Sequence, residues 1–265
     1  TELGTEVIRP ATVTTVAQDT DLVTVTLSGG AQLRARYLLG ADGMHSLVRD
    51  RSGIEFAGGS YAESFALADV HITGGLPRDQ VVLYFSPGGL MVVAPLPDNR
   101  YRIVATVDEA PPEPDTAFVQ RLLDERGPQA HPAVVEDVVW GSRFRVHHRI
   151  ADCFRHGRIL LAGDAGHVHS PAGGQGMNLG IEDAVTAGEV LSRVLTGETD
   201  DLLDEYAAAR RRTAQTVVST TGRLTDLATI PATMRPLRNT TLRAVGKVPA
   251  VRRRAAHRLS GLDRR

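Results

Sequence analysis

The sequence predicts an α/β protein in which an antiparallel sheet interrupts a strand-and-helix domain and further helices follow. Three observations support this class. Short alternating strands open the chain, strand-like runs separated by Gly and Pro turns fill residues 51–140, and residues 176–265 have a helical texture. With 265 residues, 42% of them apolar, the chain is large enough to bury a sizeable core.

Residues 1–50 are expected to form the first part of the interrupted domain. The strand-like runs in this part are Thr12–Thr15, Leu22–Leu27 and Gln32–Leu39. Ser28-Gly29-Gly30 supplies a turn between the last two, so the pattern predicts a small antiparallel meander. Ala41-Asp42-Gly43 then ends the third strand, and Ser46–Asp50 indicates the start of a short helix.

Residues 51–140 are predicted to form the inserted antiparallel sheet. The strand candidates are Ser64–Ile72, Val81–Ser86, Leu90–Pro95 and Tyr101–Val107. Gly- and Pro-containing turns separate them, and a short helix is expected over Ala117–Glu125. Tyr84, Phe85 and Met91 could line a substrate pocket, although aromatic residues in such strands are at least as often core residues.

Residues 141–195 are expected to return to the first domain, and residues 196–265 to form a C-terminal helical region. Residues 141–150 alternate, Arg158–Ala162 is a buried-strand run, and Gly176–Leu195 predicts a helix. Two or three further helices follow, with breaks at Pro231, Pro236 and Pro249.

The loop between Gly163 and Gly176 carries the strongest local signal in the chain. Its glycines let the backbone approach a ligand closely, and the helix that follows offers free N–H groups to electron-rich atoms. Asp164 follows a strand and is well placed to accept hydrogen bonds from sugar hydroxyls. By themselves, these features indicate a nucleotide-like cofactor and nothing more specific.

Two motifs resemble those of the class A flavoprotein monooxygenases, the aromatic-ring hydroxylases related to para-hydroxybenzoate hydroxylase. One is residues 39–49, which carry the Asp-Gly pair at Asp42 and Gly43. The other resembles the second FAD-binding motif of that family, and the matching residues are Gly163, Asp164, Ala165, His167, Pro171, Gly173, Gly176, Asn178 and Asp183. The resemblance implies an FAD/NAD(P)-binding Rossmann-like domain with an inserted substrate-binding sheet.

The resemblance also implies roles for single residues. Asp164 would bind the ribityl or ribose hydroxyls of FAD, and Pro171 would lie near the reactive edge of the flavin ring. Backbone N–H groups of Met177 and Asn178 would polarise the flavin pyrimidine oxygen. Asp42 and Gly43 would contact the pyrophosphate region, with Arg49 supporting their loop. Gly163, Gly174 and Gly176 complete the implied cofactor-binding set.

In such enzymes NAD(P)H reduces FAD, and O₂ supplies the oxygen that is inserted into a phenol or polyketide-like substrate. Because the cofactor carries this chemistry, no catalytic side chain is assigned. The chain has no G-x-G-x-x-G motif, so we expect it to be truncated at its N-terminus relative to the family. The alternatives are an FAD-dependent reductase of the same superfamily or an inactive remnant that does not bind FAD. A halogenase is less favoured because the only tryptophan, Trp140, lies outside a halogenase-type motif.

Metal and acid–base chemistry find little support in the sequence. His167 is more typical of a structural hydrogen bonder than of a base. His147 and His148 are adjacent on a predicted strand, so they point to opposite faces, and no metal site is expected.

The C-terminal part of the chain is strongly basic. Between Tyr206 and Arg265 there are 14 Lys and Arg residues against two acids, Asp226 and Asp263. The basic residues alternate with apolar ones and no aromatic residue follows Tyr206, so no nucleic-acid partner is expected. The single cysteine, Cys153, fits a cytoplasmic protein, no membrane span is expected, and the oligomeric state stays open.

Overall fold

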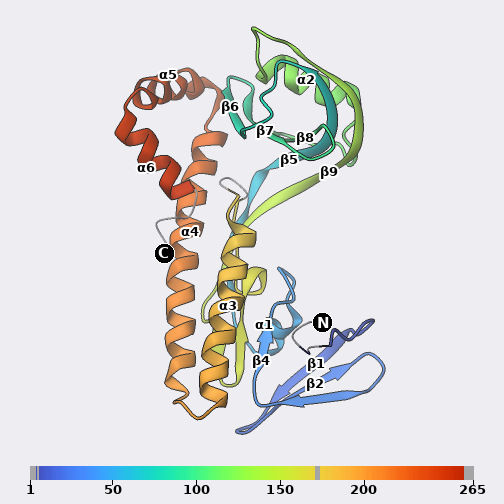
Figure 1. Ribbon diagram of the computed structural model, residues 1–265, viewed down its shortest axis with the longest axis vertical. Coiled ribbons are helices and arrows are strands. Elements are labelled where there is room, and N and C mark those ends of the chain that lie inside the picture. The colour runs from blue at the N-terminus through green and yellow to red at the C-terminus, as the bar shows by residue number, and fades with distance from the viewer. Residues whose placement is uncertain (1–3, 5, 171–173, 260–265) are drawn as a thin grey trace. The chain divides into compact units, whose positions relative to one another are not determined.

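The computed structural model describes residue 4, residues 6–170 and residues 174–259. The chain divides into two compact units, and two strands and one helix run from one unit into the other (Figure 1). Unit 1 holds Thr1–Gly59, His148–His169 and Gly174–Ser219, and unit 2 holds Ser60–His147, Ser170–Gly173 and Thr220–Arg265. The predicted α/β class with an inserted antiparallel sheet is confirmed, while the domain limits expected from the sequence stay predictions.

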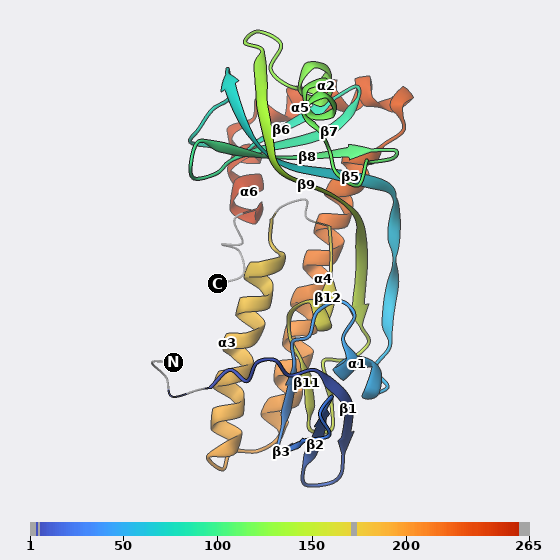
Figure 2. The ribbon, with the colours of Figure 1, turned by 90° about the vertical axis from the view of Figure 1, so that its right-hand side faces the viewer.

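Unit 1 contains two small sheets. The antiparallel meander predicted near the N-terminus consists of β1 (Val13–Gln18), β2 (Val23–Leu27) and β3 (Gln32–Ala35). The second sheet has the order β10-β11-β4, and its strands are Arg155–His156 (β10), Ile159–Leu161 (β11) and Leu38–Gly40 (β4). Here β11 pairs in parallel with β4, although about 120 residues of chain separate them (Figure 2).

The single strand predicted over Gln32–Leu39 is wrong, because the structure splits this run between the two sheets. All four residues of β3 are exposed at the edge of the meander. The apolar run of β4 instead pairs with β11, whose three residues are all buried. Short apolar runs are typical of strands in parallel sheets that are covered on both faces. The alternation that ends near Ala35 and the apolar run that starts at Leu38 therefore belong to different strands.

The helices of unit 1 pack against the parallel strands. They are the short α1 (Leu47–Arg51), α3 (Gly176–Leu195), which has the predicted bounds, and the first part of α4 (Asp201–Thr229). Leu161 of β11, Leu179 of α3 and Ala214 of α4 are fully buried in one core cluster. Ala165, in the loop after β11, is buried in the same cluster.

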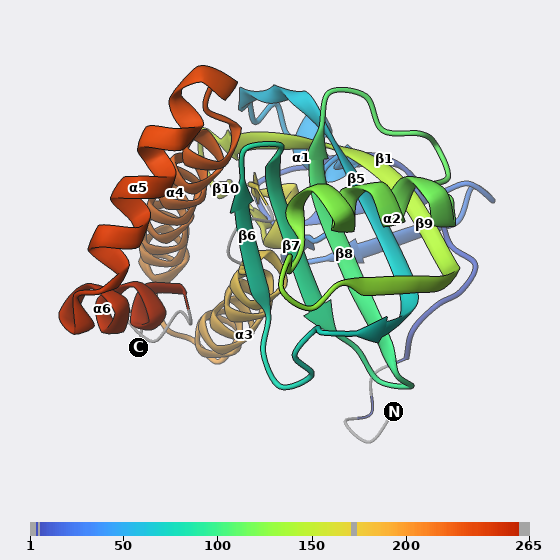
Figure 3. The ribbon, with the colours of Figure 1, turned by 90° about the horizontal axis from the view of Figure 1, so that it is seen from above.

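The largest sheet has six strands, and two long strands carry it from unit 1 into unit 2. In the order β12-β9-β5-β8-β7-β6, its strands are His167–Val168 (β12), Ala133–Ala151 (β9), Phe56–Gly74 (β5), Arg100–Val107 (β8), Gly89–Pro95 (β7) and Val82–Ser86 (β6). The helix α2 (Thr116–Arg126) lies across the middle strands when the sheet is seen from above (Figure 3). The four strands predicted in the insert are confirmed, with β5 longer than expected.

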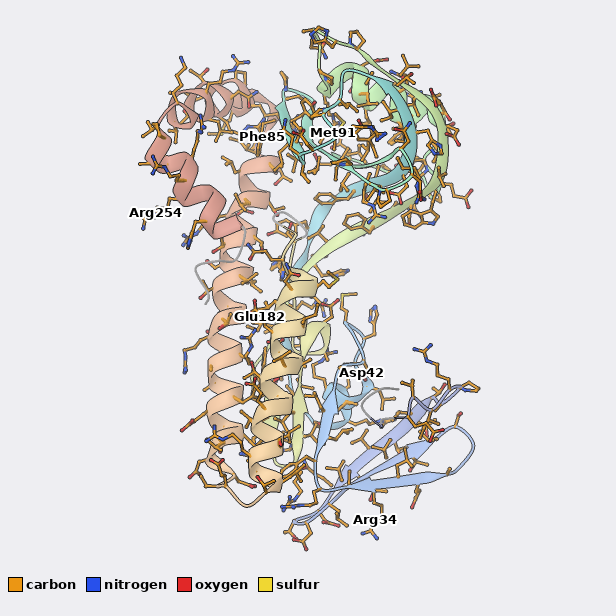
Figure 4. The ribbon with its side chains drawn as sticks, viewed as in Figure 1. Arg34, Asp42, Phe85, Met91, Glu182 and Arg254 are labelled. Atoms are coloured by element: carbon orange, nitrogen blue, oxygen red, sulfur yellow. The ribbon has the colours of Figure 1, made fainter. Side chains whose placement is uncertain are left out.

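Alternation along the strands explains why α2 covers one face of this sheet. Tyr101, Ile103 and Ala105 of β8 are buried and belong to the same core cluster as Leu122 and Leu123 of α2. Figure 4 shows Met91 inside the curved sheet and Phe85 on the side of α5 (Arg235–Gly246). Met91 is therefore a core residue rather than a pocket residue, since it is fully buried in this cluster.

A side-chain cap fixes the start of α2. The Asp115 carboxylate accepts a hydrogen bond from the Phe118 N–H at 2.7 Å. Aspartate is a favoured residue at this position because it satisfies an N–H group that has no partner inside the helix. The helix predicted from Ala117 therefore begins one residue earlier, at Thr116.

Helices complete unit 2. After α4 ends at Thr229, the chain forms α5 and α6 (Pro249–Leu259). Pro231 follows α4 and Pro249 opens α6, as the predicted breaks require. The break predicted at Pro236 is wrong, because this proline lies in the first turn of α5, where no intrahelical N–H is required. Among the described residues, no helix is both long and apolar enough to cross a membrane.

Candidate cofactor site

The two motifs meet at the ends of neighbouring parallel strands in unit 1. Gly40, the last residue of β4, pairs with Leu161, the last residue of β11, and the Ala162 N–H donates to the Gly40 carbonyl at 2.9 Å. The loops that follow carry Asp42, which Figure 4 labels, and Asp164. Ligands of α/β proteins bind outside the carboxyl ends of parallel strands, so this edge is the expected place for a cofactor.

Arg49 of α1 ties the two loops together. Its Nη1 donates to the Met44 carbonyl at 3.1 Å and to the Ala165 carbonyl at 3.2 Å, so one guanidinium holds both motifs. The residue is only 4% exposed, and its guanidinium carbon lies 3.9 Å from the centre of the Phe56 ring. The support that the resemblance implied for Arg49 thus corresponds to a cross-link between the two loops.

Asp42 organises its own loop. Its Oδ1 accepts a short hydrogen bond from the Ser46 hydroxyl, and its Oδ2 accepts one from the Val48 N–H at 3.0 Å. The Ser46 Oγ in turn accepts from the Arg49 N–H at 2.9 Å and caps α1. Gly43 has a φ of 83°, a conformation that side chains disfavour, which explains the glycine after Asp42. The Asp-Gly pair therefore shapes the turn that leads into α1.

Asp183 of α3 is the centre of a buried polar network. Its Oδ2 accepts hydrogen bonds from the Gly163 N–H at 3.0 Å and from His167 Nε2 at 2.7 Å. Its Oδ1 accepts one from Arg210 Nε of α4 at 2.5 Å. Both His167 and Asp183 are fully buried, so His167 acts here as a structural hydrogen bonder. One carboxylate thereby fixes the start of the motif loop to two helices.

The charges of this network depend on one another. Burial alone would raise the pKa of Asp183, but hydrogen bonds from His167, Arg210 and the Gly163 N–H outweigh it, so the pKa lies below its ordinary value. Tyr206 of α4 donates to the Leu161 carbonyl at 2.8 Å, and burial beside the Asp183 carboxylate raises the pKa of its phenol. The carboxylate at position 183 therefore stays ionised, and the hydroxyl at position 206 stays protonated.

Asp164 contrasts with Asp183 although both belong to the same motif. Its side chain is exposed and has no hydrogen-bond or ion-pair partner among the described residues. Gly163, directly before it, has a φ of 59° and lies against Gly180 of α3, where an added Cβ on Gly180 would come within 3.3 Å of the Gly163 Cα. The tight turn at Gly163 therefore directs an unpartnered carboxylate away from the buried network.

The start of α3 offers backbone hydrogen-bond donors. Gly174 has a φ of 62°, and no acidic residue lies in the first turn of α3. The backbone N–H groups of Gly176, Met177 and Asn178 have no hydrogen-bond partner in the described part of the chain. Unpaired N–H groups at the start of a 20-residue helix favour negative charge. Pro171, the remaining predicted contact, lies outside the described residues.

Sequence reasoning missed Arg210 and Tyr206. Both lie on α4, more than 20 residues after Asp183, in a stretch whose pattern indicates only a basic helix. The i, i+4 spacing of Tyr206 and Arg210 places them on one face of that helix, which was the available signal. The spacing does not reveal that this face contacts Leu161 of β11 and Asp183 of α3.

These residues fit the flavin and ribityl part of FAD. The unpartnered Asp164 carboxylate suits sugar hydroxyls, and the free N–H groups of α3 suit the electron-rich flavin pyrimidine. The sequence has no G-x-G-x-x-G loop that would suit the adenosine diphosphate part. Fold and site thus define the chain as an α/β protein with a binding edge for a nucleotide-like cofactor.

Comparisons with known proteins identify the family. A family model described as an FAD binding domain matches residues 1–221. The chain is 37% identical over 243 residues to the 12-dehydrotetracycline 5-monooxygenase/anhydrotetracycline 6-monooxygenase of Streptomyces rimosus, covering 83% of this chain and 47% of that protein. The chain therefore belongs to the FAD-binding domain family.

Two further relatives agree with this assignment. An aromatic compound monooxygenase of Bacillus subtilis, itself uncharacterised, is 34% identical over 269 residues and is covered to 54% of its length, against 98% of this chain. The solved anhydrotetracycline hydroxylase of Streptomyces rimosus superposes with a TM-score of 0.77 at 35% identity, over 99% of this chain and 54% of that one. The chain thus spans about half the length of the relatives that it matches.

Proposed function

We propose that this chain is the flavin-binding and substrate-covering part of an FAD-dependent monooxygenase. The reaction would hydroxylate an aromatic or polyketide-like small molecule with NAD(P)H and O₂. The observation that carries the proposal is the meeting of the two motif loops at the ends of β4 and β11, joined by Arg49. Relatives named for monooxygenation of tetracycline intermediates support the substrate class.

Each residue of the site has a role in this proposal. Asp164 accepts hydrogen bonds from ribityl or ribose hydroxyls, and Pro171 lies near the reactive edge of the ring. The N–H groups of Met177 and Asn178 donate to the flavin pyrimidine oxygen. The residues that shape the two loops around these contacts are Asp42, Gly43, Arg49, Gly163, Gly174 and Gly176.

When bound, FAD supplies the electron transfer from NAD(P)H and the activation of O₂. The chain's own residues bind, orient and exclude water. The α3 N–H groups stabilise negative charge at the pyrimidine side, because their positive dipole end is not neutralised by an acid in the first turn. Substrate binding is assigned to the inserted sheet domain, residues 51–140.

A direct test measures FAD uptake by the 265-residue chain, through the quenching of flavin fluorescence and through flavin absorbance. Asp164→Ala is expected to weaken FAD binding about tenfold, since it removes charge-assisted hydrogen bonds. Its unfolding midpoint should not change, because the exposed carboxylate has no partner among the described residues. Glu189→Ala, which changes an exposed acid farther along α3, serves as the matched control and should bind FAD like the parent.

Failure of the chain to take up any flavin would contradict the proposal for this chain and favour the inactive remnant. Equal FAD affinity in the Asp164→Ala and Glu189→Ala variants would remove the role of Asp164. Once FAD is bound, NADPH consumption stimulated by a phenolic compound, with a hydroxylated product, would distinguish a hydroxylase from a reductase. Consumption of NADPH without a hydroxylated product would indicate the reductase.

A further inference from the structure

Unit 2 contains a cavity of about 650 Å³ that none of the proposed FAD contacts lines. It is formed by the end of β8, α2, the turn between β6 and β7, and the start of α5. Its volume lies in the range of small-molecule pockets. The charged residues that line it are Arg121, Arg126, Arg235, Asp108, Glu109 and Glu125.

These six charged residues do not neutralise one another through direct contacts. Within the described part of the chain, no ion pair shorter than 4.0 Å joins any two of them, although Arg121 and Glu125 are four residues apart on one helix. Elsewhere in the chain, partly buried arginines such as Arg155 and Arg210 do pair with acids. The charged side chains that line the cavity therefore remain available to a ligand.

Arg126 is the most buried of the three cations. It is 8% exposed, and among the described residues it donates only through Nη1, to the Thr106 carbonyl at 2.6 Å and to the Leu90 carbonyl at 3.2 Å. Its Nε is buried without a partner. Burial lowers the pKa of its guanidinium, although Glu125 and Asp108 act in the opposite direction. A buried cation without a directly paired carboxylate is costly unless an anion binds beside it.

Two other arginines surround the same space. Arg235 donates to the Pro87 carbonyl at 2.6 Å and to the Ile230 carbonyl at 3.1 Å, which holds its guanidinium at the cavity without neutralising it. The Arg121 guanidinium carbon lies 5.8 Å from the centre of the Phe118 ring. Phe118 also lines the cavity, so an apolar wall stands next to the cations.

The geometry points to a second small-molecule site in unit 2, which binds a carboxylate attached to an aromatic body. Arginine guanidiniums match the planar carboxylate, and Phe118 and Leu122 match the ring. The three acids around the same cavity disfavour a dianion such as phosphate, because they repel its second charge. This site goes beyond the proposed hydroxylase function and does not depend on FAD.

The test uses the 265-residue chain and three probes: benzoate, its neutral counterpart benzamide, and inorganic phosphate. Binding is followed through the arginine Nε–Hε resonances in ¹H–¹⁵N NMR spectra, with the Arg126 resonance assigned by its loss in Arg126→Lys. Benzoate is expected to shift this resonance in a saturable way, and benzamide to bind at least about tenfold more weakly, as the loss of one charge-assisted contact predicts.

Two variants at exposed arginines test the site without disturbing the folded core. Arg121→Gln changes an exposed side chain at the cavity, and it should weaken benzoate binding several-fold to about tenfold. Arg145→Gln changes an exposed arginine of β9 that does not line the cavity, and it should bind benzoate like the parent. Both variants are checked by their thermal unfolding midpoints.

Three results would overturn the inference: equal affinity for benzoate and benzamide, tighter binding of phosphate than of benzoate, or unchanged benzoate affinity in Arg121→Gln. Absence of any saturable shift would do the same. Failure of FAD uptake with normal benzoate binding would reject only the proposed hydroxylase function, so the two proposals can fail separately.

Discussion

Arg49 in unit 1 and Arg126 in unit 2 are two buried arginines with different surroundings. Both donate to two backbone carbonyls, and both leave a buried Nε without a partner. Arg49 also lies over the Phe56 ring and donates to the Asp50 carboxylate at 2.9 Å, whereas Arg126 faces a cavity and pairs with no acid among the described residues. The comparison separates an arginine that holds loops together from one that is available to a ligand.

The same contrast appears between Asp183 and Asp164 within the second motif. Asp183 is fully buried and has three hydrogen-bond partners, while Asp164 is exposed and has none in the described part of the chain. Residues that are satisfied inside the protein fix the position of the loop. Residues that stay unsatisfied at its surface are those that remain available to a ligand.

The largest expected effect comes from breaking the buried network at Asp183. Asp183→Asn removes the buried counter-charge of Arg210, so we expect the free energy of unfolding to fall by about 3–5 kcal/mol, as for one partner lost from a buried ion pair. Urea unfolding followed by circular dichroism measures this loss. Glu182→Gln is the control, because the Glu182 side chain is 40% exposed and lies 3.3 Å from Arg210. Figure 4 labels Glu182 on α3.

The Glu182→Gln variant should lose less than about 1 kcal/mol, which is typical of an exposed ion pair. Equal losses in the two variants would show that Asp183 is not the centre of the network.

A second pair of variants compares the two arginines directly. Arg49→Met should lower the free energy of unfolding by about 2–3 kcal/mol, because it leaves two carbonyls without a donor and removes the contact with Phe56. Arg126→Met also removes two hydrogen bonds, but it removes an unpaired buried charge as well, so we expect a loss of only about 1 kcal/mol. Thermal and urea unfolding of both variants without ligand provide the measurement, and a larger loss for Arg126→Met would reverse the comparison.

The smallest expected effect is a dependence of stability on pH. The folded pKa of Asp183 lies below its ordinary value of 3.8, so the unfolded chain binds the proton more readily. The contribution of this ionised carboxylate to the free energy of unfolding is therefore fully present above the unfolded pKa. It is lost as the pH falls through the folded pKa, and the free energy of unfolding changes by at most about 1.4 kcal/mol per pH unit. Unfolding measured from about pH 6 downward should show a shallower decline in Asp183→Asn than in the parent chain. Parallel curves would contradict the assignment.

Much of the fold could be predicted because local patterns carry it. Alternation predicted β1, β2 and the strands of the insert, and the glycine loop before a long apolar-periodic stretch predicted the bounds of α3. The split of residues 32–39 between two sheets could not be predicted, because the partner strand β11 lies about 120 residues away and leaves no local signal.

The sequence by itself determined the class of the protein and the positions of its two motifs. Glycines, a strand-end aspartate and a helix start at fixed spacing are local requirements, so they can be recognised in the chain. Only the tertiary structure decided which charged groups are neutralised. It paired Asp183 with Arg210, joined the two loops through Arg49, and left Asp164 and Arg126 without an ion-pair partner among the described residues. The physical reason is that burial and pairing depend on contacts between distant segments, and these form only when the chain folds.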